Sequence, residues 1–142
     1  RREALVPARL LGVGLPLTVV GAHLTGMPLN WQLTDLGAQL VEATTTAPTY
    51  RLYALPNTVP PKPGLVKVAE GGVAIAVEVW QLPLTQVGAF LKQVLSPLGL
   101  GSVTLADGSQ THGFICEPWA IAGAEDVSSF GGWRAYVASL NK

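Results

Sequence analysis

The sequence is poor in charge and in cysteine, and both deficits exclude whole classes of protein. Charged residues make up 13% of the 142 residues, and 9 Lys and Arg balance 9 Asp and Glu. There is no basic excess to neutralise phosphates, so we expect no nucleic-acid partner. The single cysteine, Cys116, excludes an internal disulfide and a multi-cysteine metal site. A lone thiol fits a reducing compartment, so we expect a cytoplasmic protein.

Long apolar runs are also missing. The longest stretch, residues 10–20, is interrupted by Gly12, Gly14 and Pro16 and is too short to cross a membrane. Hydrophobic residues nevertheless make up 49% of the chain, which is the reverse of a disordered composition. We expect one globular domain with no membrane partner, preceded over residues 1–17 by a linker from an upstream domain.

Most signatures of catalysis are absent. The chain has no phosphate-binding loop, no dinucleotide fingerprint, no His-Glu-x-x-His box and no nucleophile elbow. Its two histidines, His23 and His112, have no carboxylates at metal-ligand spacing, so we expect neither a metal site nor a cofactor.

Short alternating segments dominate what remains. They predict strands over residues 17–24, 39–46, 50–55, 65–68, 74–81, 103–105 and 111–116, and helices over residues 28–36, 84–94 and 133–140. Asp107-Gly108 is a strong hairpin signal between the last two strands. Regular crossover helices do not separate the strands, so the pattern favours an α+β fold with a strongly bent or barrel-like mixed sheet.

His23 is the residue of greatest chemical interest. It follows a buried strand at a bend bracketed by Gly21 and Gly26, where the backbone could approach a small ligand closely. The alternative is a histidine that caps the strand end with ordinary hydrogen bonds. Arg51 and Lys62, two of the few cations, could hold carboxylates; the alternative is solvation at the surface, which is favoured for Lys62.

Two carboxylates and a tyrosine complete the candidates. Glu78 shares a strand face with Trp80, which favours the inside of the sheet, where burial would raise its pKa and suit acid–base chemistry. On the outside it would be an ordinary solvated glutamate. Glu117 ends a buried-looking strand, as functional side chains often do, or is simply a charged strand terminus. Tyr50 could donate a hydroxyl hydrogen or pack in the core.

An ordered series of motifs resembles the C-terminal domain of allophanate hydrolases. The matching segments are residues 20–30 (VGAHLTGMPLN), 46–53 (TAPTYRLY), 61–65 (PKPGL), 78–80 (EVW), 97–101 (PLGLG), 107–108 (DG), 113–114 (GF), 116–117 (CE) and 132–136 (GWRAY). Residues 18–142 would be that domain. More distantly, the bend resembles the anion-binding loop of γ-glutamyl cyclotransferase-like proteins, which implies a small mixed β-barrel with flanking helices.

The resemblance implies a role beside an amidase domain of the same polypeptide. The amidase would convert allophanate to N-carboxycarbamate, a small dicarboxylate, and this domain would decarboxylate it in urea or cyanurate breakdown. His23 would donate the proton or orient the substrate. Asn30 would anchor the loop and Glu117 would be an acid–base partner. The carboxylates would be held by the bend and by nearby donors, namely Gly21, Ala22, Leu24, Tyr50, Arg51 and Lys62.

One alternative to the decarboxylase stays open at this point. The domain could be a non-catalytic scaffold that orders the amidase domain or joins subunits, since no self-sufficient catalytic cluster is visible and the composition is apolar. Whether it forms a homo-oligomer is left open. A cyclotransferase is disfavoured, because residues 95–98 (LSPL) offer no carboxylate where those enzymes keep their catalytic glutamate.

Overall fold

The computed structural model of the protein describes residues 14–141, in which eight strands form two sheets. The five-stranded sheet has the order β2-β5-β1-β7-β6, and its strands are β1 (Gly14–Val19), β2 (Gln39–Thr45), β5 (Ala76–Pro83), β6 (Leu98–Thr104) and β7 (Gln110–Cys116). Only the β1–β7 pair is parallel; the other three pairs are antiparallel, so the sheet is mixed.

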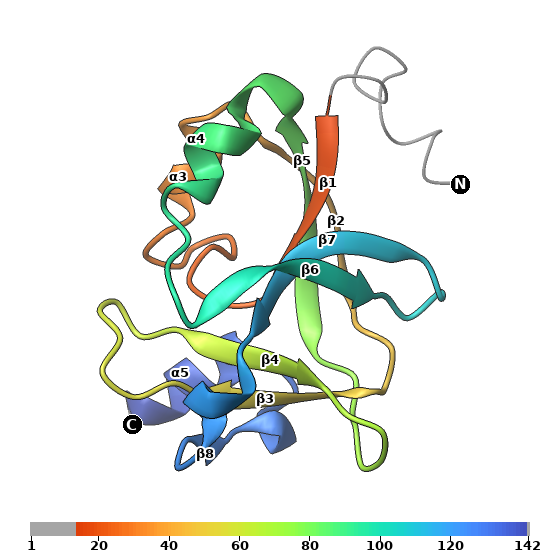
Figure 1. The fold of residues 1–142 in the computed structure, drawn as a ribbon, viewed down its shortest axis with the longest axis vertical. Helices are drawn as coiled ribbons and strands as arrows, with labels where there is room; N and C mark the ends of the chain where they lie inside the picture. Colours follow the sequence, from red (N-terminus) through yellow and green to blue (C-terminus); the bar gives the residue numbers. More distant parts are fainter. Residues whose placement is uncertain (1–13, 142) are drawn as a thin grey trace.

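The three-stranded sheet has the order β4-β3-β8, with β3 (Tyr50–Ala54), β4 (Pro63–Lys67) and β8 (Glu125–Asp126). It lies across one end of the larger sheet (Figure 1). The hydroxyl of Tyr50 joins the two sheets, because it accepts a hydrogen bond of 2.9 Å from the N–H of Thr104 in β6. The α+β class with a mixed sheet is therefore confirmed, whereas no closed barrel is found in residues 14–141.

Helices are short and flank the sheets. They are α3 (Trp31–Thr34), α4 (Val87–Leu91), α5 (Trp133–Leu140) and the 3-10 turns η1 (Leu84–Gln86), η2 (Pro118–Ile121) and η3 (Ser128–Phe130). Figure 1 shows α3 and α4 on one side of the five-stranded sheet and α5 beside the smaller sheet. None of the helices in residues 14–141 is both long and apolar enough to span a membrane.

Local signals placed the elements well but overestimated two helices. The predicted helix 133–140 is confirmed, and Asp107-Gly108 turns between β6 and β7 with Gly108 at φ +87°. The predicted helix 28–36 is a single helical turn, Trp31–Thr34, with turns on both sides of it up to Gly37 at φ +82°. The predicted helix 84–94 splits into η1 and α4. Residues 14–17 are part of β1, so the predicted linker 1–17 is wrong there, while residues 1–13 lie outside the described residues.

The hydrophobic core fills the space between the sheets and the helices. Its largest fully buried side chains are Trp133 of α5, Tyr50 of β3 and Phe90 of α4. Burying a side chain of this size stabilises a fold by about 2 kcal/mol. Because the core draws on α4, α5 and both sheets, it fixes the segments between them, including the bend that follows β1.

Candidate functional site

The chain reverses direction immediately after β1 in a tight bend, residues 20–30, called here the 20–30 bend. Its backbone closes on itself: the N–H of Leu24 donates to the carbonyl of Gly21 at 3.0 Å, and the N–H of Leu29 donates to that of Ala22 at 2.8 Å. Gly26 has φ +82°, a left-handed conformation that favours glycine. The N–H groups of Ala22 and His23 donate to no backbone carbonyl within residues 14–141.

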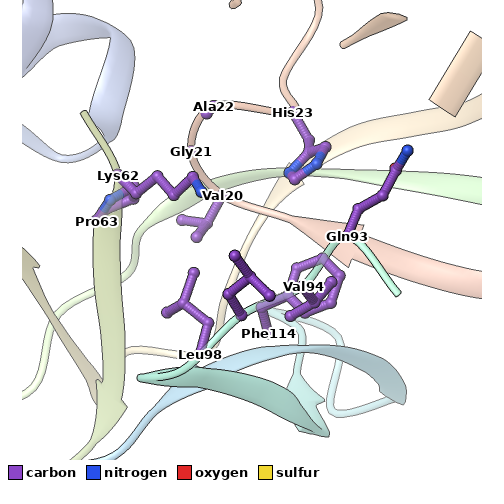
Figure 2. Close-up of a pocket in the computed structure, with 11 residues that line it drawn as sticks. Val20, Gly21, Ala22, His23, Lys62, Pro63, Gln93, Val94, Leu98 and Phe114 are labelled. Atoms are coloured by element: carbon purple, nitrogen blue, oxygen red, sulfur yellow. The ribbon is translucent and has the colours of Figure 1, made fainter. Parts of the chain in front are cut away.

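A pocket of about 480 Å³, including space open to solvent, lies beside this bend. Figure 2 shows that the His23 ring points from the bend into the pocket and that the Lys62 side chain points toward the bend. Val94, Leu98 and Phe114 lie across the pocket from them. The lining thus has a polar side and an apolar side. Its residues are Val20, Gly21, Ala22, His23, Lys62, Pro63, Gln93, Val94, Leu95, Leu98 and Phe114.

Gly21 is required for the polar side to form. A Cβ atom at this position would lie 2.3 Å from Cδ of Pro63, the first residue of β4. Only a residue without a side chain lets β4 come so close to the bend. The close approach carries Lys62, the residue before Pro63, to the edge of the pocket.

His23 is held from three directions. Its Nε2 lies 2.7 Å from Oε1 of Gln32 in α3, and its ring makes an edge contact with Phe90 of α4 at a centroid distance of 5.2 Å. Phe114 of β7 lies on a further side at 5.9 Å. Burial lowers the pKa of His23, the Gln32 hydrogen bond partly opposes this, and the Lys62 charge lowers the pKa further. The free protein therefore holds a neutral imidazole at neutral pH.

Lys62 carries the positive charge of the pocket. Its ammonium forms no hydrogen bond or ion pair with any residue of the described part of the chain, 14–141; only its backbone N–H is engaged, with Oγ1 of Thr58 at 2.9 Å. Among residues 14–141, no carboxylate lines the pocket. An ammonium with no counter-ion in this part of the chain favours an anion as a ligand.

Glu78 does not line the pocket; it contacts the 20–30 bend at Thr25, on what is called here the closed face of the bend, and its carboxylate is fully engaged. Oε1 accepts hydrogen bonds from the N–H and the hydroxyl of Thr25 and from Nε1 of Trp80, at 2.9, 3.0 and 3.1 Å. Oε2 pairs with Arg134 of α5 at 2.7 Å. The side chain is buried as predicted, but the predicted rise in its pKa is wrong. Burial raises the pKa, and the hydrogen bonds from Arg134, Thr25 and Trp80 together lower it more.

Three other candidates do not line the pocket. Arg51 pairs with Asp126 of β8 at 2.9 Å and also donates to the carbonyl of Gly71 at 2.8 Å. Tyr50 is buried in the core. Glu117 is exposed on the segment after β7, where its carboxylate accepts from Nε1 of Trp119 at 2.9 Å. These positions do not support the substrate-binding and acid–base roles expected for them.

Asn30 and Leu24 support the bend from behind. The Asn30 amide donates to the carbonyl of His23 at 2.8 Å, which is the anchoring role predicted for it. Leu24 is buried in the core and does not line the pocket, so it fixes the bend by packing. Of the predicted site residues, the structure therefore brings together Gly21, Ala22, His23 and Lys62.

Sequence reasoning missed the residues that reach the pocket from other elements. Gln32, Phe90 and Phe114 contact His23, and Gln93 lines the pocket near it. None of these residue types carries a chemical signature, and their proximity depends on packing between distant segments. No group of three or more His, Cys, Asp or Glu side chains in residues 14–141 is arranged to hold a metal ion.

The family model described as "Allophanate hydrolase C-terminal domain" matches residues 15–138. The chain belongs to this family. It is 43% identical over 132 residues to the urea amidolyase of Saccharomyces cerevisiae, a match covering 90% of this chain and 7% of that protein. The allophanate hydrolase of Kluyveromyces lactis superposes with a TM-score of 0.87 at 42% identity, over 89% of this chain and 21% of that one. The domain thus spans a small part of these larger relatives.

A free-standing relative also exists. The crystal structure of a uropathogenic E. coli-specific protein matches with a TM-score of 0.81 and 34% identity, covering 88% of this chain and 96% of that chain. Almost the whole of that solved chain is therefore matched by this one domain. At the level of fold alone, an AIG2-like protein from Mus musculus superposes with a TM-score of 0.50 at 11% identity, consistent with a γ-glutamyl cyclotransferase-like architecture.

Proposed function

We propose that this domain decarboxylates N-carboxycarbamate, the dianion that an amidase domain of the same polypeptide would make from allophanate. The observation that supports the proposal is the meeting of His23, Lys62 and free N–H groups of the 20–30 bend at one pocket. Family membership supplies the chemical context, since the relatives include a urea amidolyase and an allophanate hydrolase. The wider process would be urea or cyanurate degradation to ammonia and carbon dioxide in the cytoplasm.

The step needs two kinds of group, a carboxylate holder and a proton donor. In N-carboxycarbamate two carboxylates share one nitrogen. When one C–N bond breaks, carbon dioxide leaves and the bonding electrons stay on that nitrogen, which takes up a proton to give carbamate. A donor close to the nitrogen lowers the barrier because it neutralises this developing charge.

Lys62 and the bend would hold the carboxylate that stays. The Lys62 ammonium and the N–H groups of Ala22 and His23 can hydrogen-bond to its oxygens. The leaving carboxylate would then face Val94, Leu98 and Phe114. An apolar wall solvates a carboxylate poorly and neutral carbon dioxide well, so it favours departure.

His23 would be the proton donor, and the substrate itself would charge it. In the free protein, burial and the Lys62 ammonium both lower the pKa of His23. A bound dianion opposes the Lys62 charge and favours the imidazolium. His23 would therefore take up a proton as the substrate binds and release it to the nitrogen as carbon dioxide leaves.

The test compares the two histidines of the chain. Allophanate is converted by a separate amidase domain, and carbon dioxide release is followed with wild type, His23→Ala or His112→Ala added; His112 is exposed on β7 and does not line the pocket. We expect the acceleration by the domain to disappear with His23→Ala and to persist with His112→Ala. Equal rates with wild type and His23→Ala would contradict a catalytic role.

A stable analogue gives a second readout. Malonate has carbon in place of the nitrogen of N-carboxycarbamate, so it should bind the pocket without reacting. We expect calorimetric binding of malonate to wild type, much weaker binding of acetate, and uptake of a proton on malonate binding. If malonate does not bind while deletion of the domain alters oligomer size and melting temperature of the full-length protein, the domain is a scaffold instead.

A further inference from the structure

The hydrogen bond between His23 and Gln32 determines which ring nitrogen of His23 carries the hydrogen. Nε2 of His23 lies 2.7 Å from the amide oxygen of Gln32, which can only accept. In the neutral ring, Nε2 must then carry the hydrogen and Nδ1 must carry the lone pair. Nδ1 has no partner among residues 14–141 and is not sealed from solvent.

We propose that Gln32 is a positioning residue, whose amide oxygen keeps a hydrogen on Nε2 of His23 and thereby makes Nδ1 the nitrogen that exchanges a proton with the ligand. This inference rests on the proposed function and adds the path of the proton. Nδ1 takes a proton from solvent when the dianion binds. It passes that proton to the substrate nitrogen as the C–N bond breaks, and the ring returns to the neutral form with hydrogen on Nε2.

The short segment that includes α3 holds Gln32 against the ring of His23. The single turn α3 directs Gln32 back over the bend, and Asn30 at its start ties down the carbonyl of His23 at 2.8 Å. Two points of the same residue, its backbone and its ring, are thus fixed from one short segment. Such double anchoring restricts both the position and the rotation of the imidazole.

No other group competes with Gln32 for the ring. From α4 the ring meets Phe90 and from β7 it meets Phe114, neither of which hydrogen-bonds. Lys62, just before β4, is the one charged side chain of residues 14–141 whose charge shifts the pKa of His23. An ammonium cannot accept a hydrogen, so the choice of tautomer falls to Gln32.

The first test observes the tautomer directly, without any activity. The protein is labelled with nitrogen-15 in histidine, His112→Gln assigns the signals, and the spectrum is recorded above the pKa of His23. We expect hydrogen on Nε2 in wild type and a mixture of tautomers in Gln32→Met, which has similar length but no amide. Hydrogen on Nδ1 in wild type would overturn the inference.

The second test uses activity and its pH profile. We expect Gln32→Met to lower kcat between about tenfold and a hundredfold with little change in KM, as is typical when the orienting partner of a functional histidine is lost. Gln32→Glu restores an acceptor for Nε2 and adds a negative charge, so it should recover kcat and move the pH profile upward by about one unit. Gln110→Met, on the exposed start of β7, is the matched control and should behave as wild type.

The outcomes separate this inference from the proposed function. If His23→Ala abolishes the acceleration while Gln32→Met keeps the wild-type kcat and pH profile, His23 is catalytic and Gln32 does not position it. If neither variant affects carbon dioxide release, the proposed function fails, and the tautomer spectrum alone still decides whether Gln32 sets the ring.

Discussion

The two faces of the 20–30 bend differ in how their polar groups are partnered. On one face, Thr25, Glu78 and Arg134 form a closed network in which both carboxylate oxygens are engaged. On the other face, the ammonium of Lys62 and one nitrogen of His23 have no partner in residues 14–141. These two groups are only partly buried, so a ligand can reach them, and we call this side the open face of the bend.

The same difference favours an anion as the ligand of the proposed site. The Glu78–Arg134 pair is neutral as a unit, because each charge cancels the other at 2.7 Å. On the pocket face, no carboxylate of residues 14–141 cancels the charge of Lys62. In the proposed function, one face of the bend would therefore provide rigidity and the other the site for an anion.

The largest expected effect comes from breaking the network of Thr25, Glu78 and Arg134 on the closed face. Glu78→Ala removes the shared acceptor of Thr25, Trp80 and Arg134 and leaves the buried Nε1 of Trp80 unpaired. We expect the free energy of unfolding, measured by urea denaturation, to fall by about 3 kcal/mol. The reduction is limited because the Arg134 side chain, 48% exposed, can turn to water.

Arg51→Ala is the matched control for that prediction. It breaks the ion pair with Asp126, in which both side chains are about one-third exposed. Pairs this exposed to water contribute up to about 1 kcal/mol. A loss from Glu78→Ala no greater than that from Arg51→Ala would mean that the closed network does not anchor the bend.

The next largest effect is expected from changing the close contact between Gly21 of the bend and Pro63 of β4. Gly21→Ala places a Cβ atom 2.3 Å from Pro63, so β4 must move away. We expect a loss of about 2 kcal/mol of stability together with weaker malonate binding, because Lys62 moves with Pro63. Gly26→Ala is the comparison: its added Cβ meets no atom within 4 Å, and its cost comes from φ +82° alone. That variant should lose about 1 kcal/mol and bind malonate normally; unchanged malonate affinity in Gly21→Ala would count against the placement of Lys62.

A smaller effect is expected from removing the ammonium of Lys62. Lys62→Met should leave stability unchanged and weaken malonate binding about tenfold, or about 1.4 kcal/mol, as expected for loss of one charged hydrogen bond. Lys67→Met is the control, since Lys67 is exposed on β4 and its ammonium reaches only Oγ1 of Thr104, at 3.4 Å. Calorimetry checks both variants. Equal affinities for the two would show that Lys62 does not hold the carboxylate.

Local sequence predicted the bend and its histidine because those features are encoded within a few residues. Glycines at 21 and 26 surround His23, and the strand before them is apolar. The hairpin at Asp107-Gly108 and the helix 133–140 are equally local and were also predicted. Of the two overestimated helices, 28–36 forms only the turn Trp31–Thr34, and 84–94, whose apolar spacing is helical, is divided between η1 and α4.

The partners of each site residue were not predictable in this way. Arg51 and Lys62 are both cations beside loops in the sequence, yet Arg51 faces Asp126 and Lys62 faces the pocket. Glu78 was correctly placed inside, but the sign of its pKa shift depended on Arg134, 56 residues later in the chain. Charge chemistry at a buried site is decided by tertiary partners, and a single sequence does not show them.

The smallest expected effect is on the pH dependence of stability, which separates the contribution of His23 from that of Glu78. Both His23 and Glu78 have a pKa lowered by folding, from 6.5 and from 4.5 respectively, so the unfolded chain binds more protons at each site. Stability from each group is then present above its unfolded pKa and lost as the pH falls through its folded pKa. We expect a first, small loss on acidification below about 6.5 and a second below about 4.5. His23→Gln should remove the first loss and Glu78→Ala the second, in urea denaturation over a pH series.

Malonate should reduce only the first loss, because a dianion beside Lys62 stabilises the imidazolium on the open face and does not reach the carboxylate on the closed one. A first loss that malonate leaves unchanged would mean that the dianion and His23 do not share the pocket.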